Sequence, residues 1–385
     1  MPTPRSIPAI LLAAALIGLT AGRPQPAAPA TDATLPLLTT RGKAPAAALL
    51  SRTQPEPPPG ARTLRHQPSP VSVRRPARPD SERQDPAAAP SPRPYLHFAR
   101  TGPSLSRADH FRVGSITKTF IATVVLQLAA EHRLSLSDPV AHHLPGLVRG
   151  PGVDGRTITL RALLTHTSGL HDFAAVTKGT VPLTPVLAVR TALAHRPSPK
   201  GRWAYSNTNY VVLGMVIERV TGNSYATEAE RRILHPLRLT GTSFPGARTS
   251  LPSPHGRAFT GDGRDVTALD PRVAGAAGEL ISTLADLNRF YAALLSGRLL
   301  PAPLLREMLN TRPAQGHYGM GLSPRTLPCG TTVWGHNGRI AGSYVRSAAT
   351  RDGRHVVTFR VNTDKPTVPA LESAVLTAEF CPRSP

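Results

Sequence analysis

The chain has 385 residues and a net charge of +22, a length that allows one large or two ordinary domains. The positive charge is consistent with attraction to an anionic surface such as a bacterial cell wall, or with a GC-rich genome that enriches arginine. Nucleic-acid binding is disfavoured, because the basic residues are scattered, aromatic residues make up only 5% of the chain and no nucleic-acid-binding signature is present.

Residues 1–22 have the pattern of a secretory signal peptide. Arg5 precedes an apolar run over residues 7–20, which ends in small residues. A membrane anchor is the alternative, but the run is shorter than the roughly 20 residues that span a bilayer. We therefore expect an exported protein, secreted or associated with the cell wall, without a stable membrane anchor.

Residues 23–94 are rich in proline, alanine and arginine and contain few large apolar residues. Proline clusters cannot sustain helices or central strands, so we expect a disordered tether or an insertion here. Short strands remain candidates over residues 46–50 and 95–99. A single globular domain is then expected over residues 95–385.

The middle of the chain has helical periodicity. Apolar residues three or four apart predict helices over residues 116–132, 182–196, 210–220 and 225–234. Together they predict an all-helical subdomain at about residues 120–275. A further helix is expected to begin at Thr283, because Asp286 three residues later resembles a capping box.

The C-terminal quarter is enriched in β-branched and aromatic residues. Strands are predicted over residues 331–334, 343–349 and 355–361, with a hairpin turn at Asp352-Gly353 and a final helix over residues 369–380. This order predicts an α+β fold, in which an antiparallel sheet is flanked by helices and carries an inserted all-helical region.

Two cysteines, Cys329 and Cys381, lie in this last part of the chain. In an exported protein such a pair readily forms a disulfide, here between the C-terminal helix and an upstream turn. Two free buried thiols are the alternative.

Ser115 and Lys118 are the first candidates for catalysis. They lie three residues apart at a predicted helix start, so the serine hydroxyl and the lysine amine can meet on one face. A nucleophilic serine needs such a neighbour to take or relay its proton. The same pattern also occurs at ordinary helix starts.

Two further short motifs follow, Tyr205-Ser206-Asn207 and His336-Asn337-Gly338. Each has an ordinary explanation when taken alone. Tyr205 suits a core aromatic residue, Asn207 a helix cap, and His336 a strand residue before a turn. Their order and wide spacing behind Ser115 and Lys118 are what favour a shared site.

The three motifs together resemble those of the serine penicillin-recognising enzymes. The chain is similar in particular to secreted serine D-alanyl-D-alanine carboxypeptidases of the class C β-lactamase-like branch, from about residue 107 to residue 381. The similar stretches are Phe-Arg-Val-Gly-Ser115-Ile-Thr-Lys, Leu-Leu-Thr-His166-Thr-Ser-Gly169-Leu, Tyr205-Ser-Asn207-Thr-Asn, Tyr318-Gly-Met-Gly321-Leu and Gly335-His336-Asn-Gly338. The two cysteines also sit where members of that branch have a pair.

The resemblance implies acyl transfer through a serine ester at Ser115, on the peptide bond before a C-terminal D-alanine of a peptidoglycan stem peptide. Lys118 would activate the serine as a charge or as a base, and Tyr205 would relay the proton to the leaving amine. His336 would help to bind the substrate carboxylate and would support Tyr205. The other implied roles are a hydrogen bond from Asn207 to the substrate amide and an oxyanion hole made by the backbone N–H groups of Ser115 and Arg339 beside Gly338.

The resemblance also implies that β-lactams inhibit the protein and that no metal or cofactor takes part. We further expect a monomer, an expectation for which the sequence carries no signal. Two departures from the family pattern stand out. The proline-rich stretch lies where relatives have two N-terminal strands, so these strands are either separated by a large insertion or lost. The third motif lacks the threonines of related carboxypeptidases, which leaves Arg339 or Arg325 to supply a cation for the carboxylate.

Other activities remain open on the same scaffold. A β-lactamase, an esterase or a D-amino-acid amidase would use the same acyl-enzyme and differ only in pocket shape and deacylation. A non-catalytic relative that binds the cell wall is the third reading, since the N-terminal region departs from the family pattern.

Overall fold

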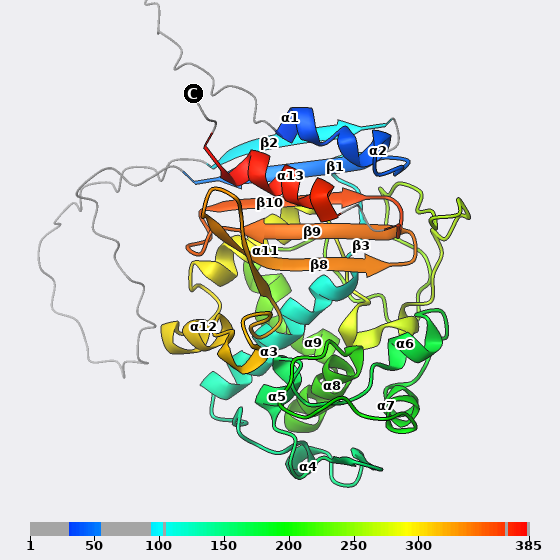
Figure 1. Ribbon diagram of the computed structural model, residues 1–385, viewed down its shortest axis with the longest axis vertical. Helices are drawn as coiled ribbons and strands as arrows, with labels where there is room; N and C mark the ends of the chain where they lie inside the picture. The colour runs from blue at the N-terminus through cyan, green and yellow to red at the C-terminus, as the bar shows by residue number, and fades with distance from the viewer. Residues whose placement is uncertain (1–30, 55–93, 103–104, 366–368, 383–385) are drawn as a thin grey trace, which may run out of the picture.

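The computed structural model describes residues 31–54, 94–102, 105–365 and 369–382. The predicted signal peptide and residues 23–30 and 55–93 of the predicted tether lie outside the described residues. A six-stranded sheet lies above a large helical region (Figure 1). The predicted α+β fold with an inserted helical region is confirmed.

The sheet is antiparallel throughout, in the order β2-β1-β10-β9-β8-β7. Its strands are β1 (Ala47–Thr53), β2 (Tyr95–Thr101), β7 (Ser323–Thr326), β8 (Thr332–Ile340), β9 (Ser343–Ala349) and β10 (His355–Val361). The predicted bounds of β9 and β10 are confirmed. Strand β8 is longer than the predicted strand over residues 331–334, so it carries the whole His336-Asn337-Gly338 motif.

Strand β1 corrects the predicted boundary of the domain. It lies within the segment assigned to a tether, yet it pairs with β10 on one side and β2 on the other. Two short helices, α1 (Thr31–Thr34) and α2 (Leu37–Thr40), precede it. The prediction of a tether was therefore wrong for residues 31–53, and both N-terminal strands expected from the resemblance are present.

The side chains of β1 are buried on both faces of the sheet, which explains why this strand is stable in the middle of the sheet. Ala46, Ala48 and Leu50 pack into the core beneath the sheet, whereas Ala47 and Leu49 pack into a second core on the other face. Successive strand residues point to opposite faces, so a strand covered on both faces is apolar throughout. The sequence of such a strand therefore shows no alternation of apolar and polar residues.

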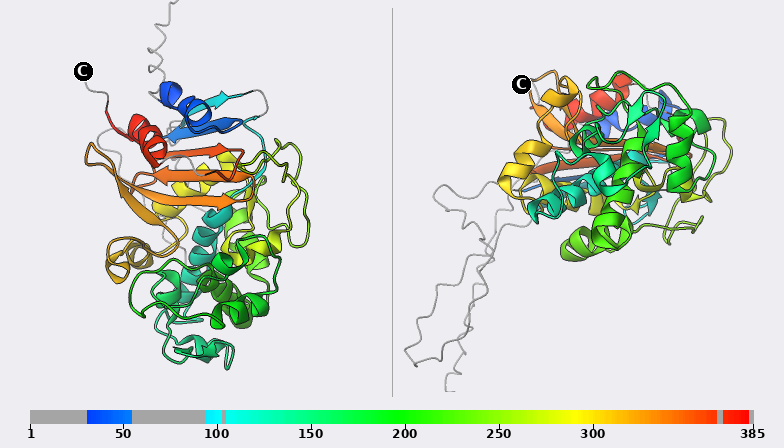
Figure 2. Two further views of the ribbon diagram at one scale, coloured as in Figure 1. Left: turned by 45° about the vertical axis from the view of Figure 1, so that its right-hand side comes forward. Right: turned by 90° about the horizontal axis from the view of Figure 1, so that it is seen from below.

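Helices cover both faces of the sheet. Helix α13 (Pro369–Phe380) packs with α1 on one face, and α11 (Leu284–Leu295) packs against β1, β9 and β10 on the other (Figures 1 and 2). The predicted bounds of α13 are confirmed. The predicted start of α11 is also confirmed, because the Thr283 side chain accepts a hydrogen bond of 3.2 Å from the Asp286 backbone N–H.

The helical region extends away from the β8 side of the sheet (Figure 2). Its helices are α3 (Thr117–Ala130), α4 (Val140–His143), α5 (Leu160–Leu164), α6 (Phe173–Thr177), α7 (Pro185–Leu193), α8 (Asn207–Thr221), α9 (Tyr225–Ala229), η2 (Glu230–Leu234), α10 (His235–Leu237), η3 (Pro271–Val273) and η4 (Gly275–Ala277). Helix α8 contacts α3, α5, α6, α7 and η4, so it forms the centre of this region.

Smaller elements complete the described chain. They are the 3-10 helices η1 (Gly114–Ile116) and η5 (Arg312–Ala314), helix α12 (Ala302–Met308), and the two-residue strands β3 (Phe111–Arg112), β4 (Arg149–Gly150), β5 (Val153–Asp154) and β6 (Ile281–Ser282). Strand β3 pairs with β6, and β4 pairs with β5.

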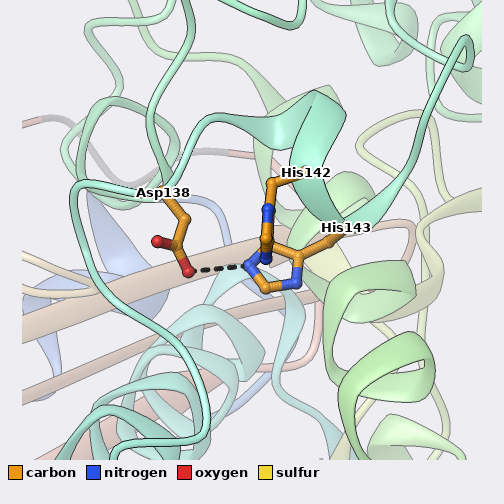
Figure 3. Close-up of side chains that lie close together, drawn as sticks. All are labelled: Asp138, His142 and His143. Atoms are coloured by element: carbon orange, nitrogen blue, oxygen red, sulfur yellow. Dashed lines mark hydrogen bonds and ion pairs between the residues drawn. The ribbon is translucent and has the colours of Figure 1, made fainter.

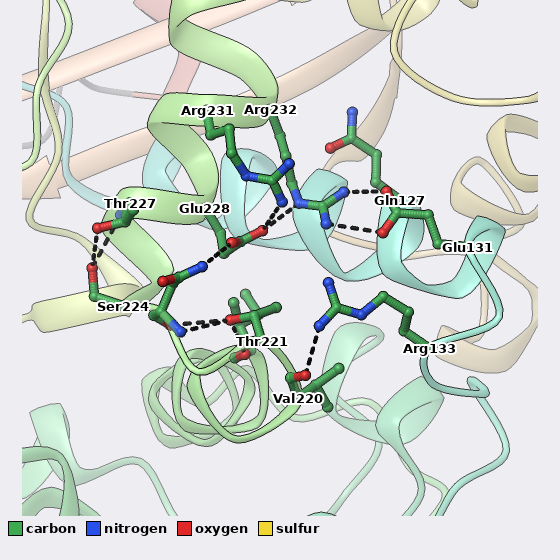
Figure 4. Close-up of polar contacts among 12 residues, drawn as sticks. Gln127, Glu131, Arg133, Val220, Thr221, Ser224, Thr227, Glu228, Arg231 and Arg232 are labelled. Atoms are coloured by element: carbon green, nitrogen blue, oxygen red, sulfur yellow. Dashed lines mark hydrogen bonds and ion pairs between the residues drawn. The ribbon is translucent and has the colours of Figure 1, made fainter.

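A network of charged side chains joins α9 and η2 to the end of α3 (Figure 4). The Glu228 carboxylate, whose side chain is fully buried, accepts hydrogen bonds from Arg231, Arg232 and Asn223. Arg232 also binds Glu131 at the end of α3. Burial alone would raise the pKa of Glu228, but the hydrogen bonds outweigh it and lower the pKa to about 2.

The predicted disulfide is present. Cys329 lies in the turn between β7 and β8, Cys381 follows α13, and their Cα atoms are 5.9 Å apart. The bond therefore ties the C-terminal helix to the sheet. In the described residues, no helix combines the length and the apolar character needed to cross a membrane.

Candidate active site

Ser115 lies in η1, a single 3-10 turn between strand β3 and helix α3. Gly114 has a φ of +52°, a left-handed conformation that favours glycine. The Thr117 hydroxyl donates a 2.7 Å hydrogen bond to the Gly114 carbonyl and so closes the turn. The Ser115 side chain remains half-buried and lines a large cleft.

Lys118 projects from the first turn of α3 and is fully buried. Its Nζ atom lies 3.0 Å from Ser115 Oγ, 2.7 Å from Asn207 Oδ1 and 2.7 Å from the Ala277 carbonyl oxygen. Burial lowers the pKa of Lys118 to about 7, while the nearby Asp172 carboxylate acts in the opposite direction. The predicted pairing of Ser115 with Lys118 is therefore present as a direct contact.

Tyr205 lies beside both residues. Lys118 Nζ is 5.0 Å from the centre of the Tyr205 ring. Burial raises the pKa of the Tyr205 hydroxyl, and its hydrogen bond with Ser115 opposes part of that rise. The structure thus brings together the three predicted residues: Ser115 and Tyr205 line the same cleft, and Lys118 lies beside both.

His166, from the Leu-Leu-Thr-His stretch, is fully buried and packs against Tyr205. Its ring centre lies 4.3 Å from that of Tyr205. Its Nδ1 atom accepts hydrogen bonds from the Ser206 backbone N–H at 3.2 Å and from Asn209 Nδ2 at 3.1 Å. His166 therefore fixes the turn that delivers Tyr205 and Asn207 to the site.

Asn207, the first residue of α8, contacts Lys118 on one side and Asp172 on the other. Its Nδ2 atom donates to both carboxylate oxygens of Asp172 at 3.1 Å, and its backbone N–H donates to Oδ1 at 3.0 Å. Sequence reasoning missed Asp172, which caps the N-terminus of α6 through the Ala174 N–H. An aspartate placed directly before the apolar Phe173 was the available signal.

Strand β8 packs closely against the Ser115 turn. A Cβ atom on Gly114 would lie 2.8 Å from the Arg339 backbone nitrogen, and one on Gly338 would lie 3.1 Å from the Ser115 nitrogen. The backbone nitrogens of Ser115 and Arg339 therefore lie on the two sides of one narrow contact. This is the place at which an oxyanion hole was predicted.

The position of His336 suits one of its two expected roles, the support of Tyr205, and not the binding of a carboxylate. It is only 3% exposed and does not line the cleft. Its Nε2 atom shares a 2.7 Å hydrogen bond with the Tyr318 hydroxyl, and burial together with the Lys118 charge lowers its pKa to about 3. A neutral imidazole bonded to Tyr318 supports the packing around Tyr205, and the geometry does not present it to a carboxylate in the cleft.

The two arginines that were candidates for binding the substrate carboxylate occupy different places. Arg339 is exposed and lines the cleft. Arg325 lies in β7, where its guanidinium is 3.8 Å from Glu372, and it does not line the cleft. Of the two, Arg339 has the position needed to contact a bound molecule.

The cleft itself has a volume of about 1330 Å³ and brings together parts of the helical region and the sheet. Four exposed cations line it, Lys178, Arg264, Arg339 and Lys365, against the two acids Asp172 and Asp364. Ser115 thus opens into a cleft whose charged lining is predominantly positive.

Arg112 holds one wall of this cleft in place. Its guanidinium donates to the carbonyl oxygens of Thr249 at 2.6 Å, Thr267 at 2.9 Å and Leu269 at 3.4 Å. Leu269 belongs to the loop that lines the cleft. Because Arg112 lies three residues before Ser115, one short segment supports both the serine and the opposite wall.

A group of possible metal ligands lies outside the cleft. The ligand atoms of Asp138, His142 and His143 are within 4.8 Å of one another (Figure 3). Asp138 Oδ2 already contacts His143 Nε2 at 2.9 Å and accepts the Ser135 backbone N–H at 2.8 Å. These contacts stabilise the turn before α4. The expectation that the reaction needs no metal stays a prediction.

With this geometry in view, comparison with known proteins identifies the family. The family model described as Beta-lactamase matches residues 96–380. The chain belongs to the beta-lactamase family. The predicted membership of the β-lactamase and penicillin-binding protein superfamily is confirmed, whereas the finer identification as a D-alanyl-D-alanine carboxypeptidase is not decided by this match.

Curated relatives in this superfamily include penicillin-binding proteins. The chain is 29% identical to the putative penicillin-binding protein PbpX of Bacillus subtilis over 266 residues, which is 68% of this chain and 63% of PbpX. It is 30% identical to penicillin-binding protein 4 of Amycolatopsis lactamdurans over 208 residues, 52% of this chain and 55% of that protein. The chain therefore spans less than two thirds of the length of either relative.

Solved structures in the family align over more of the chain. The D-stereospecific amidohydrolase from Streptomyces sp. is 37% identical with a TM-score of 0.74, and the alignment covers 91% of this chain and 99% of the amidohydrolase. The D-amino acid amidase of Ochrobactrum anthropi SV3, at 23% identity and a TM-score of 0.71, shares the fold over 91% of this chain and 97% of the amidase.

Proposed function

We propose that the protein is a serine hydrolase that cleaves amide bonds on the carbonyl side of D-amino acid residues through an acyl-enzyme at Ser115. The observation that carries this proposal is the contact between Ser115 Oγ and a buried Lys118 amine whose other two neighbours are carbonyl oxygens. The 37% identity with the Streptomyces D-stereospecific amidohydrolase over nearly the whole of both chains supports D-configured substrates.

In the acylation step, Ser115 Oγ attacks the amide carbonyl carbon while its proton passes to the Lys118 amine. The pKa of about 7 leaves a large fraction of Lys118 unprotonated at neutral pH. The carbonyl oxygen takes up negative charge between the backbone N–H groups of Ser115 and Arg339. One such donor contributes about 2.7–4 kcal/mol to the transition state in other enzymes.

The tetrahedral intermediate collapses when the carbon–nitrogen bond breaks and the leaving amine takes up a proton. Tyr205 lies beside Lys118 and lines the cleft together with Ser115, so we assign to it the relay of that proton from Lys118 to the amine. Water then attacks the ester by the reverse sequence of proton transfers. The products are the free D-configured acid, the amine and the regenerated serine.

The D-alanyl-D-alanine carboxypeptidase reaction predicted from the sequence is one member of this class. Its substrate ends in a free carboxylate, and the cationic lining of the cleft favours a negatively charged group. We assign the carboxylate contact to Arg339 rather than to His336, since His336 is buried against Tyr318. Peptidoglycan stem peptides are then the natural substrate and β-lactams the inhibitors.

A D-amino-acid amidase is the second candidate, supported by the match to the Streptomyces amidohydrolase. One set of rate measurements separates the two. A peptide ending in D-Ala-D-Ala should turn over faster than its C-terminal amide if the carboxylate is recognised, whereas an amidase should prefer a simple D-amino acid amide. Turnover of the L-amide at the rate of the D-amide, or of nitrocefin or a short-chain ester alone, would contradict the proposal.

We further infer that the protein acts outside the cytoplasm, as the disulfide and the predicted signal peptide suggest. Expression of the full chain in a bacterial host, followed by fractionation and N-terminal sequencing, tests this inference. The expected result is extracytoplasmic protein that has lost about its first 22 residues, as is usual for signal peptides. Full-length protein confined to the cytoplasm would contradict it.

A further inference from the structure

Asp172 has no place in the mechanism given above, yet it lies in the cleft beside the reacting groups. It is 57 residues from Ser115 in sequence and is bonded to Asn207, whose side-chain amide donates to both of its carboxylate oxygens. We propose that Asp172 is a positioning residue for Lys118, because its carboxylate holds the Asn207 amide with Oδ1 turned toward the lysine.

The hydrogen-bonding capacity of the neutral Lys118 amine is fully used at this site. A neutral amine has two N–H donors and one lone pair. The Ala277 carbonyl and Asn207 Oδ1, each 2.7 Å away, can only accept, so they take both N–H groups. The lone pair is left for Ser115 Oγ at 3.0 Å, which is the arrangement that a base requires.

This arrangement depends on which end of the Asn207 amide faces Lys118. Turning an amide side chain over exchanges the positions of its oxygen and nitrogen with little change in shape. The surrounding hydrogen bonds therefore decide between the two orientations. If the amide turned over, Nδ2 would face Lys118 and would compete with Ser115 for the lone pair. The amine would then no longer be directed at the serine.

Asp172 excludes that second orientation. An ionised carboxylate accepts hydrogen bonds and cannot donate them, so it binds Nδ2 and rejects Oδ1. The Asn207 backbone N–H also donates to Asp172 Oδ1 at 3.0 Å, which fixes the carboxylate relative to the start of α8. The same negative charge opposes the fall in the pKa of Lys118 that burial causes, so Asp172 also keeps the lysine basic.

The inference rests on the proposed serine acyl transfer, so its test uses a reagent that needs an activated serine but no particular substrate. A fluorophosphonate reacts when the serine oxygen displaces fluoride from phosphorus and the hydroxyl proton passes to the base. The rate of labelling would be measured from pH 5 to pH 10 for the wild type, for Asp172→Asn and for the control Asp154→Asn. The control also removes one negative charge, but Asp154 ends strand β5, pairs with Arg156 and does not line the cleft.

For Asp172→Asn we expect labelling at least about tenfold slower at its plateau, with the rise in rate shifted to lower pH because the lysine has lost a negative neighbour. Asparagine is a good helix cap, so the thermal midpoint should stay close to that of the wild type. The double variant Asp172→Asn/Asn207→Asp restores an acceptor facing Lys118. It should therefore react faster than the single variant, with its rise shifted to higher pH.

The inference is overturned if Asp172→Asn keeps the plateau and midpoint of the wild type, or if the double variant is no faster than the single variant. A wild-type protein that does not react with the fluorophosphonate overturns it together with the proposed function. A wild-type protein that reacts with the fluorophosphonate but hydrolyses no D-configured amide would exclude the proposed substrate class. The role of Asp172 would be unaffected by that result.

Discussion

A Cβ atom on Gly338 would lie 1.8 Å from the carbonyl oxygen of Val113. The two residues belong to segments more than 200 positions apart, and their contact sets the distance between strand β8 and the Ser115 turn. No side chain fits at this point, because real Cβ atoms do not approach a carbonyl oxygen so closely. The glycine of the third motif is thus a spacing requirement of the site.

The first prediction follows from that contact. Gly338→Ala should push β8 away from the Ser115 turn and lower the rate of serine labelling at least about 100-fold, because a displacement of about 1 Å has an effect of that size. Gly150→Ala is the matched control, since its Cβ would meet Leu193 atoms at an ordinary 3.5 Å. Equal labelling rates of the two variants would contradict the account of β8.

The second prediction concerns the dependence of acylation on pH. Lys118 is protonated below its pKa of about 7 and neutral above it, so acylation that uses the amine as a base should rise with pH through about 7. Single-turnover release of p-nitroaniline from a D-aminoacyl p-nitroanilide would measure the rate. A rate that is constant or falling between pH 5 and 9 would instead indicate that the charged lysine is the active form.

A substitution at Lys118 gives the third prediction. Lys118→Arg introduces a guanidinium that stays protonated at every accessible pH, so the variant should be inactive throughout the range. Lys200→Arg changes an exposed lysine outside the cleft and should leave the profile unaltered. Appreciable activity of Lys118→Arg with an unshifted profile would exclude the amine as the base.

The fourth prediction addresses the charged network around Glu228. Its pKa lies below that of an unfolded glutamate, so the network stabilises the fold above about pH 4.5, and that stabilisation is lost as the pH falls toward 2. Glu228→Gln should lower the free energy of unfolding by on the order of 3 kcal/mol at pH 7 and much less near pH 2. Glu230→Gln, in the same segment, serves as the control. A melting temperature equal to that of the wild type at pH 7 would show that the network adds no stability.

The disulfide gives the fifth prediction. The bond joins residues 52 positions apart, and closing a loop of that length stabilises a fold by about 4 kcal/mol in the chain-entropy model. The double variant Cys329→Ser/Cys381→Ser should unfold at a lower denaturant concentration while its serine remains reactive, because both cysteines lie away from the cleft. An unchanged midpoint would indicate that α13 is held by packing alone.

The sequence predicted those elements whose signals are local. Strands β9 and β10, helix α13 and the cap of α11 follow from β-branched runs, a hairpin turn and a capping box. Residues 46–50 were kept as a candidate strand, but the full extent of β1 and its place in the domain were missed, because both of its faces are covered and Ala47–Thr53 carries no clear alternation of apolar and polar residues. Its place in the sheet depends on partners more than 300 residues away.

In the candidate site, too, the residues with a local sequence signal were predicted and those that depend on distant contacts were not. Short motifs and a family resemblance were enough to predict Ser115, Lys118, Tyr205 and Asn207, and the structure brings all four together. Asp172 could not be ranked above other loop acids, because its significance lies in three hydrogen bonds from Asn207, which is 35 positions away. Which face of β8 His336 occupies was likewise decided by packing against Tyr318.

The central claim is that Ser115 forms a covalent acyl-enzyme, and intact-protein mass spectrometry after incubation with penicillin tests it most directly. The account predicts a mass increase of one penicillin per chain, located on the peptide that contains Ser115 and absent from a folded Ser115→Ala variant. An unmodified wild-type protein that retains its fold, or an adduct that persists in Ser115→Ala, would contradict it.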